Sequence, residues 1–222
     1  MQSQKKCITI VPIFNHLEED QMMEIMDATT QSSYKKGSLI YRDGDEVASL
    51  FIVRKGKIRI YKISESGKEQ LVRILLPGDY TGELAVFGKM YQTSYAEAIS
   101  DTEICMITKE KLQDFLIKYP TISLKILAEF SNRLNESEKQ TTRFATEKVE
   151  TRIAFFLAEL IEDPNLSLEV ELPMSKKDVA SYLGTTPETL SRKLADLEEK
   201  GLILQKTSKR IEIMDIDELL LV

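Results

Sequence analysis

The 222-residue sequence has no tryptophan, one histidine and two cysteines, and it lacks any long apolar run. A membrane-spanning helix needs about 18 or more consecutive apolar residues, and no such stretch is present, so we expect no membrane partner. The N-terminal stretch MQSQKKCITIVPIF has neither the long apolar centre nor the small-residue cleavage site of a secretory signal. These absences predict a cytoplasmic protein.

The scarcity of cysteine and histidine restricts the chemistry further. Two cysteines cannot form a disulfide framework, so a bond between Cys7 and Cys105 would be conditional. Both could join His16 and a carboxylate in a zinc site, but their spacing offers no close pair of ligands. A metal-dependent jelly-roll enzyme needs several histidines, and no Ser-His-Asp or Cys-His arrangement is visible. We expect no enzymatic activity, no metal and no cofactor.

The first half of the chain has the pattern of an antiparallel β-roll. Between about Tyr34 and Ile107, short runs rich in β-branched and aromatic residues are separated by Gly and Asp turn signals. The runs are too closely spaced for crossover helices, which indicates a roll or jelly roll. We predict an α+β protein with a β-roll sensor domain and N-terminal arm over residues 1–119.

A long helix is predicted over residues 120–145, where neither Gly nor a second Pro interrupts the pattern. A narrow seam repeats at spacings of three and four residues, as in helices that pair in a coiled coil. The alternative is an amphipathic helix lying on its own domain's core. We expect a homodimer, with a seam that comprises Leu127, Phe130, Leu134, Ser137, Thr141 and Phe144.

Residues 146–222 contain the signals of a winged helix-turn-helix. Ser175 and Asp178 have the spacing of a capping box, and Gly184 ends the helix that follows. Thr186 is a good N-cap and Pro187 suits the first position of a second helix, which runs to about Lys200. Two helices joined by so short a turn form a helix-turn-helix.

The second helix has one apolar side, formed by Leu190, Leu194 and Leu197, and one polar side. In a recognition helix the N-terminal polar residues meet base edges in the major groove of double-stranded DNA, where Arg pairs with guanine and Glu accepts from cytosine. The alternative is an ordinary solvated face. The predicted DNA contacts are Ser175, Lys176, Thr186, Glu188, Thr189, Ser191, Arg192, Lys193, Lys209 and Arg210.

Charge distribution supports this prediction, although net charge does not. Residues 146–222 contain 10 Lys and Arg against 16 Asp and Glu. The bases nevertheless gather on the two helices and on a predicted β-hairpin wing with a Lys-Thr-Ser-Lys-Arg tip, where a phosphate backbone would pass. These basic residues are Lys176, Lys177, Arg192, Lys193, Lys206, Lys209 and Arg210.

The whole chain resembles the CRP/FNR superfamily of bacterial transcription regulators, on the segments GDYTGELAVF and SKKDVASYLGTTPETLSRKLADLEEKGLI. The resemblance implies that Glu188 and Arg192 read bases, together with Ser191 as in the FNR branch. Pro187 stands where the CRP branch has a further base-reading Arg, which favours an FNR-like TTGA half-site. The loop of residues 64–70 is similar to the loop through which FNR touches RNA polymerase, a further expected partner.

The resemblance also bears on the signal. Thr93 and Ser94 stand where cyclic-AMP receptors carry the Arg that neutralises the cyclic phosphate, so we do not expect cyclic AMP to bind. Two cysteines are too few for an FNR-type iron–sulfur cluster. The pattern is most similar to the FLP group of Gram-positive bacteria, for which a thiol–disulfide switch is implied, here between Cys7 and Cys105.

Two lysines beside Cys7 favour its thiolate, whereas Cys105 among apolar neighbours could equally be an inert strand residue. Two function classes remain open. One is a DNA-binding transcription regulator, and the other is a cytoplasmic ligand-binding β-roll protein, a small-molecule or metal sensor without redox control.

Overall fold

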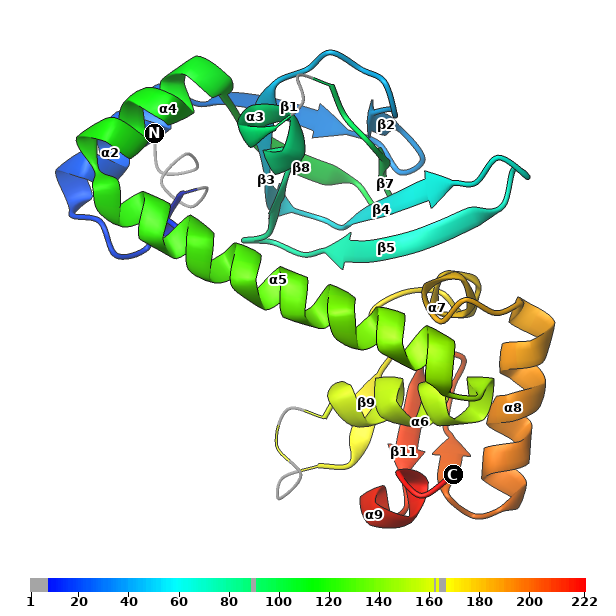
Figure 1. The fold of residues 1–222 in the computed structure, drawn as a ribbon. Coiled ribbons are helices and arrows are strands. Elements are labelled where there is room, and N and C mark those ends of the chain that lie inside the picture. The colour runs from blue at the N-terminus through cyan, green and yellow to red at the C-terminus, as the bar shows by residue number, and fades with distance from the viewer. Residues whose placement is uncertain (1–7, 89–90, 162, 164–166) are drawn as a thin grey trace. The chain divides into compact units, whose positions relative to one another are not determined.

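A computed structural model describes residues 8–88, 91–161, 163 and 167–222 (Figure 1). The chain divides into two compact units, Met1–Arg133 and Leu134–Val222. Cys7 lies outside the described residues. None of the described helices combines the length and apolar content that spanning a bilayer requires.

The first unit is an antiparallel β-roll of two four-stranded sheets, in the orders β1-β8-β3-β6 and β2-β7-β4-β5. Helices precede, interrupt and follow the strands. The strands are β1 (Thr30–Tyr34), β2 (Leu39–Tyr41), β3 (Ser49–Lys55), β4 (Ile58–Ile63), β5 (Glu69–Leu75), β6 (Tyr80–Thr81), β7 (Tyr95–Ala98) and β8 (Thr102–Thr108). The helices are α2 (Glu19–Asp27), α3 (Glu83–Phe87), α4 (Lys109–Lys118) and the part of α5 (Pro120–Thr146) up to Arg133; the rest of α5 belongs to the second unit.

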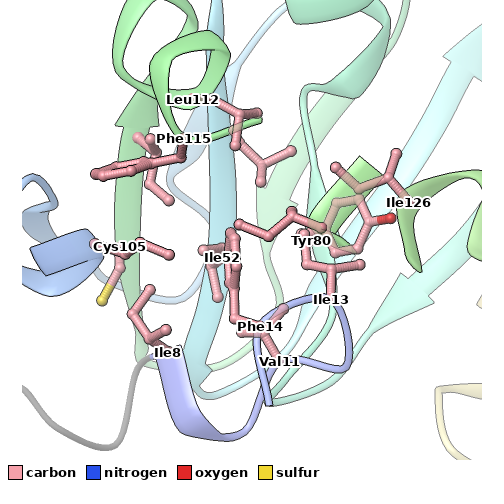
Figure 2. Close-up of a cluster of buried hydrophobic side chains, with 14 of the residues drawn as sticks. Ile8, Val11, Ile13, Phe14, Ile52, Tyr80, Cys105, Leu112, Phe115 and Ile126 are labelled. Carbon is pink, nitrogen blue, oxygen red and sulfur yellow. The ribbon is translucent and has the colours of Figure 1, made fainter. Parts of the chain in front are cut away.

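Strand β3 is apolar without alternation because both of its faces are buried. Successive side chains of a strand point to opposite faces. Phe51 and Val53 belong to the cluster enclosed by the two sheets, whereas Leu50 and Ile52 belong to a second cluster. This second cluster also receives buried residues of the arm, α2, α4 and α5, and Figure 2 shows several of them. The helices therefore cover the outer face of the first sheet.

Helix α5 is a single element of 27 residues that begins at Pro120, where a missing N–H costs no helical hydrogen bond. Its N-terminal part packs on the roll, since Ile122 and Ile126 are 0% and 5% exposed. Beyond Ile126 the helix has no further fully buried side chain among the described residues. The predicted long helix is confirmed.

The second unit is a winged helix-turn-helix. Three antiparallel strands in the order β10-β11-β9 pack with the helices of this unit. The elements are α6 (Val149–Glu159), β9 (Glu169–Glu171), α7 (Lys176–Tyr182), α8 (Pro187–Glu199), β10 (Ile203–Gln205), β11 (Arg210–Ile213) and α9 (Ile216–Leu219). The predicted combination of β-roll, long helix and winged helix-turn-helix is confirmed.

Candidate nucleic-acid interface

Local hydrogen bonds start both helices of the helix-turn-helix where the sequence predicts. The Ser175 hydroxyl oxygen accepts from the Asp178 N–H at 3.1 Å and caps α7. The Thr186 hydroxyl oxygen accepts from the Thr189 N–H at 3.2 Å and caps α8. Each cap satisfies a backbone donor that has no partner within its helix.

The turn between the helices requires glycine. Gly184 has φ +65°, a left-handed conformation in which an L side chain is strained. A Cβ at Gly184 would lie 3.5 Å from the ring of Phe144 and from the guanidinium of Arg152. The turn also receives a bond from α5, because the Gln140 side-chain amide donates to the Tyr182 carbonyl at 3.1 Å. The end of α5 thus supports the turn.

Helix α8 has two distinct sides. Leu190, Leu194 and Leu197 are at most 1% exposed and fix the helix in the domain. The opposite side leaves Glu188, Ser191, Arg192 and the cap Thr186 exposed, while Thr189 is half-buried. No ion pair involves Arg192 within the described part of the chain. The side chains expected to reach base edges are therefore exposed.

Glu188 is electrostatically suited to the start of α8. Its own backbone N–H and the Thr186 hydroxyl hold the pKa of its carboxyl below the usual range. Unpaired N–H groups and the helix dipole favour a negative charge at this end of a helix. The carboxylate is thus an ionised acceptor.

Lys193, which the sequence places among the DNA contacts, is engaged within the domain. Its ammonium lies 3.0 Å from a Glu150 carboxylate oxygen and 2.9 Å from an Asp196 oxygen. Lys200 pairs with the second oxygen of Glu150. Hydrogen bonds to Asp196 and Glu150 raise the pKa of Lys193, so the charge persists, but it is neutralised locally. This cluster joins α8 to α6.

The wing is a tight hairpin with an uneven charge distribution. The Thr207 hydroxyl accepts from the N–H groups of Lys209 and Arg210 at 3.2 and 2.9 Å, which shapes the tip. The Lys206 ammonium pairs with Glu169 at 2.9 Å and Glu212 at 3.1 Å. Arg210 is 3.9 Å from Glu169, whereas Lys209 has no ion pair among the described residues and is exposed.

Fewer of the predicted basic residues are without an ion pair in the described ranges than the count of Lys and Arg suggests. Arg192, Lys177 and Lys209 are exposed and take part in no ion pair within the described ranges. Lys176 donates to a neutral partner, the Gln205 side-chain oxygen, at 2.8 Å and forms no direct ion pair among the described residues, although its charge also interacts with the Glu198 carboxylate. A phosphate backbone would therefore meet these four cations first.

The six predicted seam residues of α5 differ in their surroundings. Leu127 and Leu134 are 62% and 60% exposed. Phe130 instead packs against the roll, with its ring 6.0 Å from that of Phe87. Ser137 and Thr141 are exposed, and the Thr141 hydroxyl donates to the Ser137 carbonyl. Phe144 lies under the Arg152 guanidinium at 5.2 Å.

In the roll, the Glu83 carboxylate is held by cations. Arg73 of β5 and Arg133 of α5 both donate to its Oε1 at 2.8 Å, and the Arg133 guanidinium lies 4.3 Å from the centre of the Tyr80 ring. Burial raises the pKa of Tyr80 to about 12. The preceding Gly82 has φ +92°, and a Cβ there would lie 2.1 Å from the Ser49 carbonyl oxygen. This cluster links the roll to α5.

Of the two predicted redox residues, the structure describes one. Cys105 is 0% exposed within the cluster that also contains Ile8, the residue that follows Cys7 (Figure 2). The buried Tyr41 hydroxyl shares a 2.6 Å hydrogen bond with the Thr81 hydroxyl, and burial raises the pKa of Tyr41. No group of three or more His, Cys, Asp or Glu among the described residues is arranged to hold a metal.

Three features are absent from the sequence prediction. Leu124 is 68% exposed on α5 and extends the apolar side formed by Leu127 and Leu134. Glu150 neutralises Lys193, and Gln205 connects the wing to α7 and α8. The three-residue spacing of Leu124 and Leu127 could have revealed the longer apolar side of α5. The roles of Glu150 and Gln205 depend on tertiary contacts, which no local pattern shows.

Comparison with known proteins identifies both units. The Cyclic nucleotide-binding domain family matches residues 31–119, and the Crp-like helix-turn-helix domain family matches residues 151–221. The "Probable transcriptional regulator flp" of Lacticaseibacillus casei is 32% identical over 213 residues, which cover 96% of each chain.

Other relatives agree. The fumarate and nitrate reduction regulatory protein of Vibrio cholerae is 32% identical over 210 residues, covering 93% of this chain and 82% of the relative. The structure of FixK2 from Bradyrhizobium japonicum matches with a TM-score of 0.74 and 27% identity, over 86% of this chain and 95% of that one.

Proposed function

Because the chain belongs to the CRP/FNR family of transcription regulators, which are not enzymes, we propose that it binds inverted TTGA-type DNA sites as a homodimer. The observation that carries this proposal is the exposed side of α8. Glu188, Ser191 and Arg192 are presented together at its N-terminal half, while three buried leucines fix the opposite side. This is the part of a recognition helix that enters the major groove.

The residue types favour the TTGA half-site. Arg192 can donate two hydrogen bonds to a guanine, and the ionised Glu188 can accept from a cytosine amino group of the complementary strand. Pro187 occupies the first position of α8 and offers no side-chain donor for a further base. We assign phosphate contacts to Ser175 and Lys176 at the start of α7 and to the exposed Lys209 at the wing tip.

Dimerisation through α5 is supported by its exposed leucines. Leu124, Leu127 and Leu134 are each at least 60% exposed, and contiguous apolar area of this kind is usually covered by a partner. Their spacings of three and seven residues are those of a coiled-coil seam. Since Phe130 packs on the roll, we place the seam on the leucine side, rotated from the predicted positions toward Leu124. Two copies would supply the two recognition helices that an inverted repeat needs.

A thiol–disulfide switch is the proposed regulation. Cys105 lies in an interior cluster, and the backbone neighbour of Cys7, Ile8, is buried in the same cluster. A bond between the cysteines requires Cα atoms within about 7 Å, which this sharing of one cluster favours. In a reducing cytoplasm the bond would form only under oxidative stress. Cyclic AMP is not the proposed signal, since no Arg stands at Thr93 or Ser94.

The proposed DNA function is tested by fluorescence anisotropy. One duplex carries two inverted TTGA half-sites about one helical turn apart, and the control duplex has the same composition in scrambled order. Specific binding should exceed control binding by about 10³-fold or more at physiological salt. Equal affinity for both duplexes would reject sequence-specific binding and leave the ligand-binding roll as the better hypothesis.

A further inference from the structure

The Gln205 side chain joins three elements of the winged helix-turn-helix. Gln205 ends strand β10, where the wing begins. Its amide nitrogen donates to Glu198 Oε2 of α8 at 3.0 Å, and its backbone N–H donates to Glu198 Oε1 at 2.7 Å. Its amide oxygen accepts from the Lys176 ammonium of α7 at 2.8 Å. One side chain therefore ties the wing to both helices of the motif.

The donors and acceptors of this cluster fit in only one orientation. A reversed Gln205 amide would point its NH₂ at the Lys176 ammonium and its oxygen at the Glu198 carboxylate, two repulsive contacts. The bonds from Gln205 hold the pKa of Glu198 below its ordinary range, so the acceptor stays ionised. All three residues are half-buried, which strengthens such charge-assisted bonds relative to fully exposed ones.

The connection adds to the contacts that hold the strands of the wing, among them the bond from the Leu172 N–H to the Lys209 carbonyl at 2.8 Å and the ion pair of Lys206 with Glu169. Ile203, Ile211 and Ile213 are at most 2% exposed and anchor the two strands in the core. The residues from Lys206 to Arg210 lie beyond this anchor and are exposed. Bonds of Lys206 and Thr207 to the Arg210 carbonyl, together with the Thr207 hydroxyl, make the tip a compact turn. Gln205 directly precedes this turn, so we expect a constraint at Gln205 to act on the β10 side of the tip, while the bond from Leu172 to Lys209 holds its β11 side.

We propose that Gln205 is a positioning residue that sets the wing relative to the recognition helix, so that Lys209 reaches the DNA backbone. This inference rests on the proposed DNA function. It assigns no base contact to Gln205 itself. Its effect is on the number of phosphates that the wing engages, which the salt dependence of binding reports.

The cluster allows a test by exchange of donor and acceptor. Gln205→Glu alone places two carboxylates face to face and should displace the wing. Adding Glu198→Gln restores the hydrogen bonds with donor and acceptor exchanged. The amide introduced at position 198 donates to the carboxylate introduced at position 205, and this carboxylate also accepts from the Lys176 ammonium. The double variant has the same net charge as the wild type. Leu204→Ala, on the exposed side of the same strand, is the matched control.

In the wild type, Lys209→Ala should reduce the slope of log affinity against log salt by about one. In the Gln205→Glu background, Lys209→Ala should change the slope little, and in the exchanged double variant its full effect should return. Equal effects of Lys209→Ala in all backgrounds, including the Leu204→Ala control, would overturn the proposal.

A measurement without DNA separates this inference from the DNA function. Amide hydrogen exchange of residues 203–213 should be faster in Gln205→Glu than in wild type and should return to the wild-type rate in the exchanged variant. Unchanged exchange in Gln205→Glu would overturn the positioning role. If exchange behaves as expected but wild-type protein does not distinguish the two duplexes, the proposed function fails while the connection between wing and α8 stands.

Discussion

Arg192 and Lys193 are neighbours on α8, but we expect the first to contribute to DNA binding and the second to stability. Replacing each with alanine tests this expectation. Arg192 is exposed and has no ion pair in the described part of the chain, whereas Lys193 pairs with Glu150 and Asp196. Arg192→Ala should remove about 1–3 kcal/mol of discrimination for one guanine, or about 5- to 150-fold in specific affinity. Its stability should stay within about 0.5 kcal/mol of wild type, as for most surface changes.

Lys193→Ala should show the reverse pattern. The change removes the charge-assisted hydrogen bonds to Glu150 and Asp196, and with the first of them a connection between α8 and α6. Solvent screens part of this loss, and Glu150 retains Lys200 as a partner. The free energy of unfolding should still fall further than in Arg192→Ala. Its salt dependence of DNA binding should equal that of wild type, because the ammonium is already neutralised.

The assay combines urea denaturation with anisotropy titrations at several salt concentrations on the TTGA and scrambled duplexes. Arg192→Ala should lose affinity for the TTGA duplex alone. Equal losses on both duplexes would mean that the guanidinium contacts phosphate only. A salt slope reduced by about one in Lys193→Ala would refute the reasoning, since its ammonium must then leave Glu150 to bind a phosphate.

Three further changes test the remaining proposals. Leu134→Lys should give monomers by light scattering, because it places like charges within the proposed seam; a dimeric variant would contradict that seam. Cys7→Ser should abolish the cross-link to Cys105 in non-reducing peptide maps after diamide, and with it any redox dependence of DNA binding. Identical DNA binding by oxidised and reduced wild type would mean that the cysteines do not regulate binding. Substituting Gly67 or Lys68 should impair transcription activation and spare DNA binding, and parallel loss of both would indicate misfolding instead.

Features specified by local sequence were predictable. The caps Ser175 and Thr186, the turn at Gly184 and the leucine side of α8 follow from residue type and spacing, and the structure has each of them. Helical periodicity identifies sides of a helix but not their partners. It therefore could not show that Phe130 packs on the roll, although this residue shares the three-and-four spacing of the seam.

Charge partners were the least predictable part of the candidate site. Lys193 and Glu150 are 43 residues apart, and Lys176 and Gln205 are 29 apart. No local pattern links such positions, because the contacts depend on how helices and strands pack. The sequence consequently could not show which of the predicted cations have ion-pair partners within the domain, whereas Arg192 and Lys209 are exposed.

The ion pair of Glu83 with Arg133 determines where the β-roll could be separated from the rest of the chain. A cut at the end of α4 would remove Arg133 together with the buried Ile122 and Ile126, which pack on the roll. It would leave the largely buried Glu83 carboxylate with Arg73 but without Arg133, and removing a partner from a buried charge is destabilising. An independently folding β-roll unit must extend through Arg133, and it would carry the exposed Leu124 and Leu127 of the proposed seam but not Leu134. The proposed sensing domain and part of the proposed subunit contact would thus lie in one continuous piece of polypeptide, and a change selected for either must remain compatible with the other.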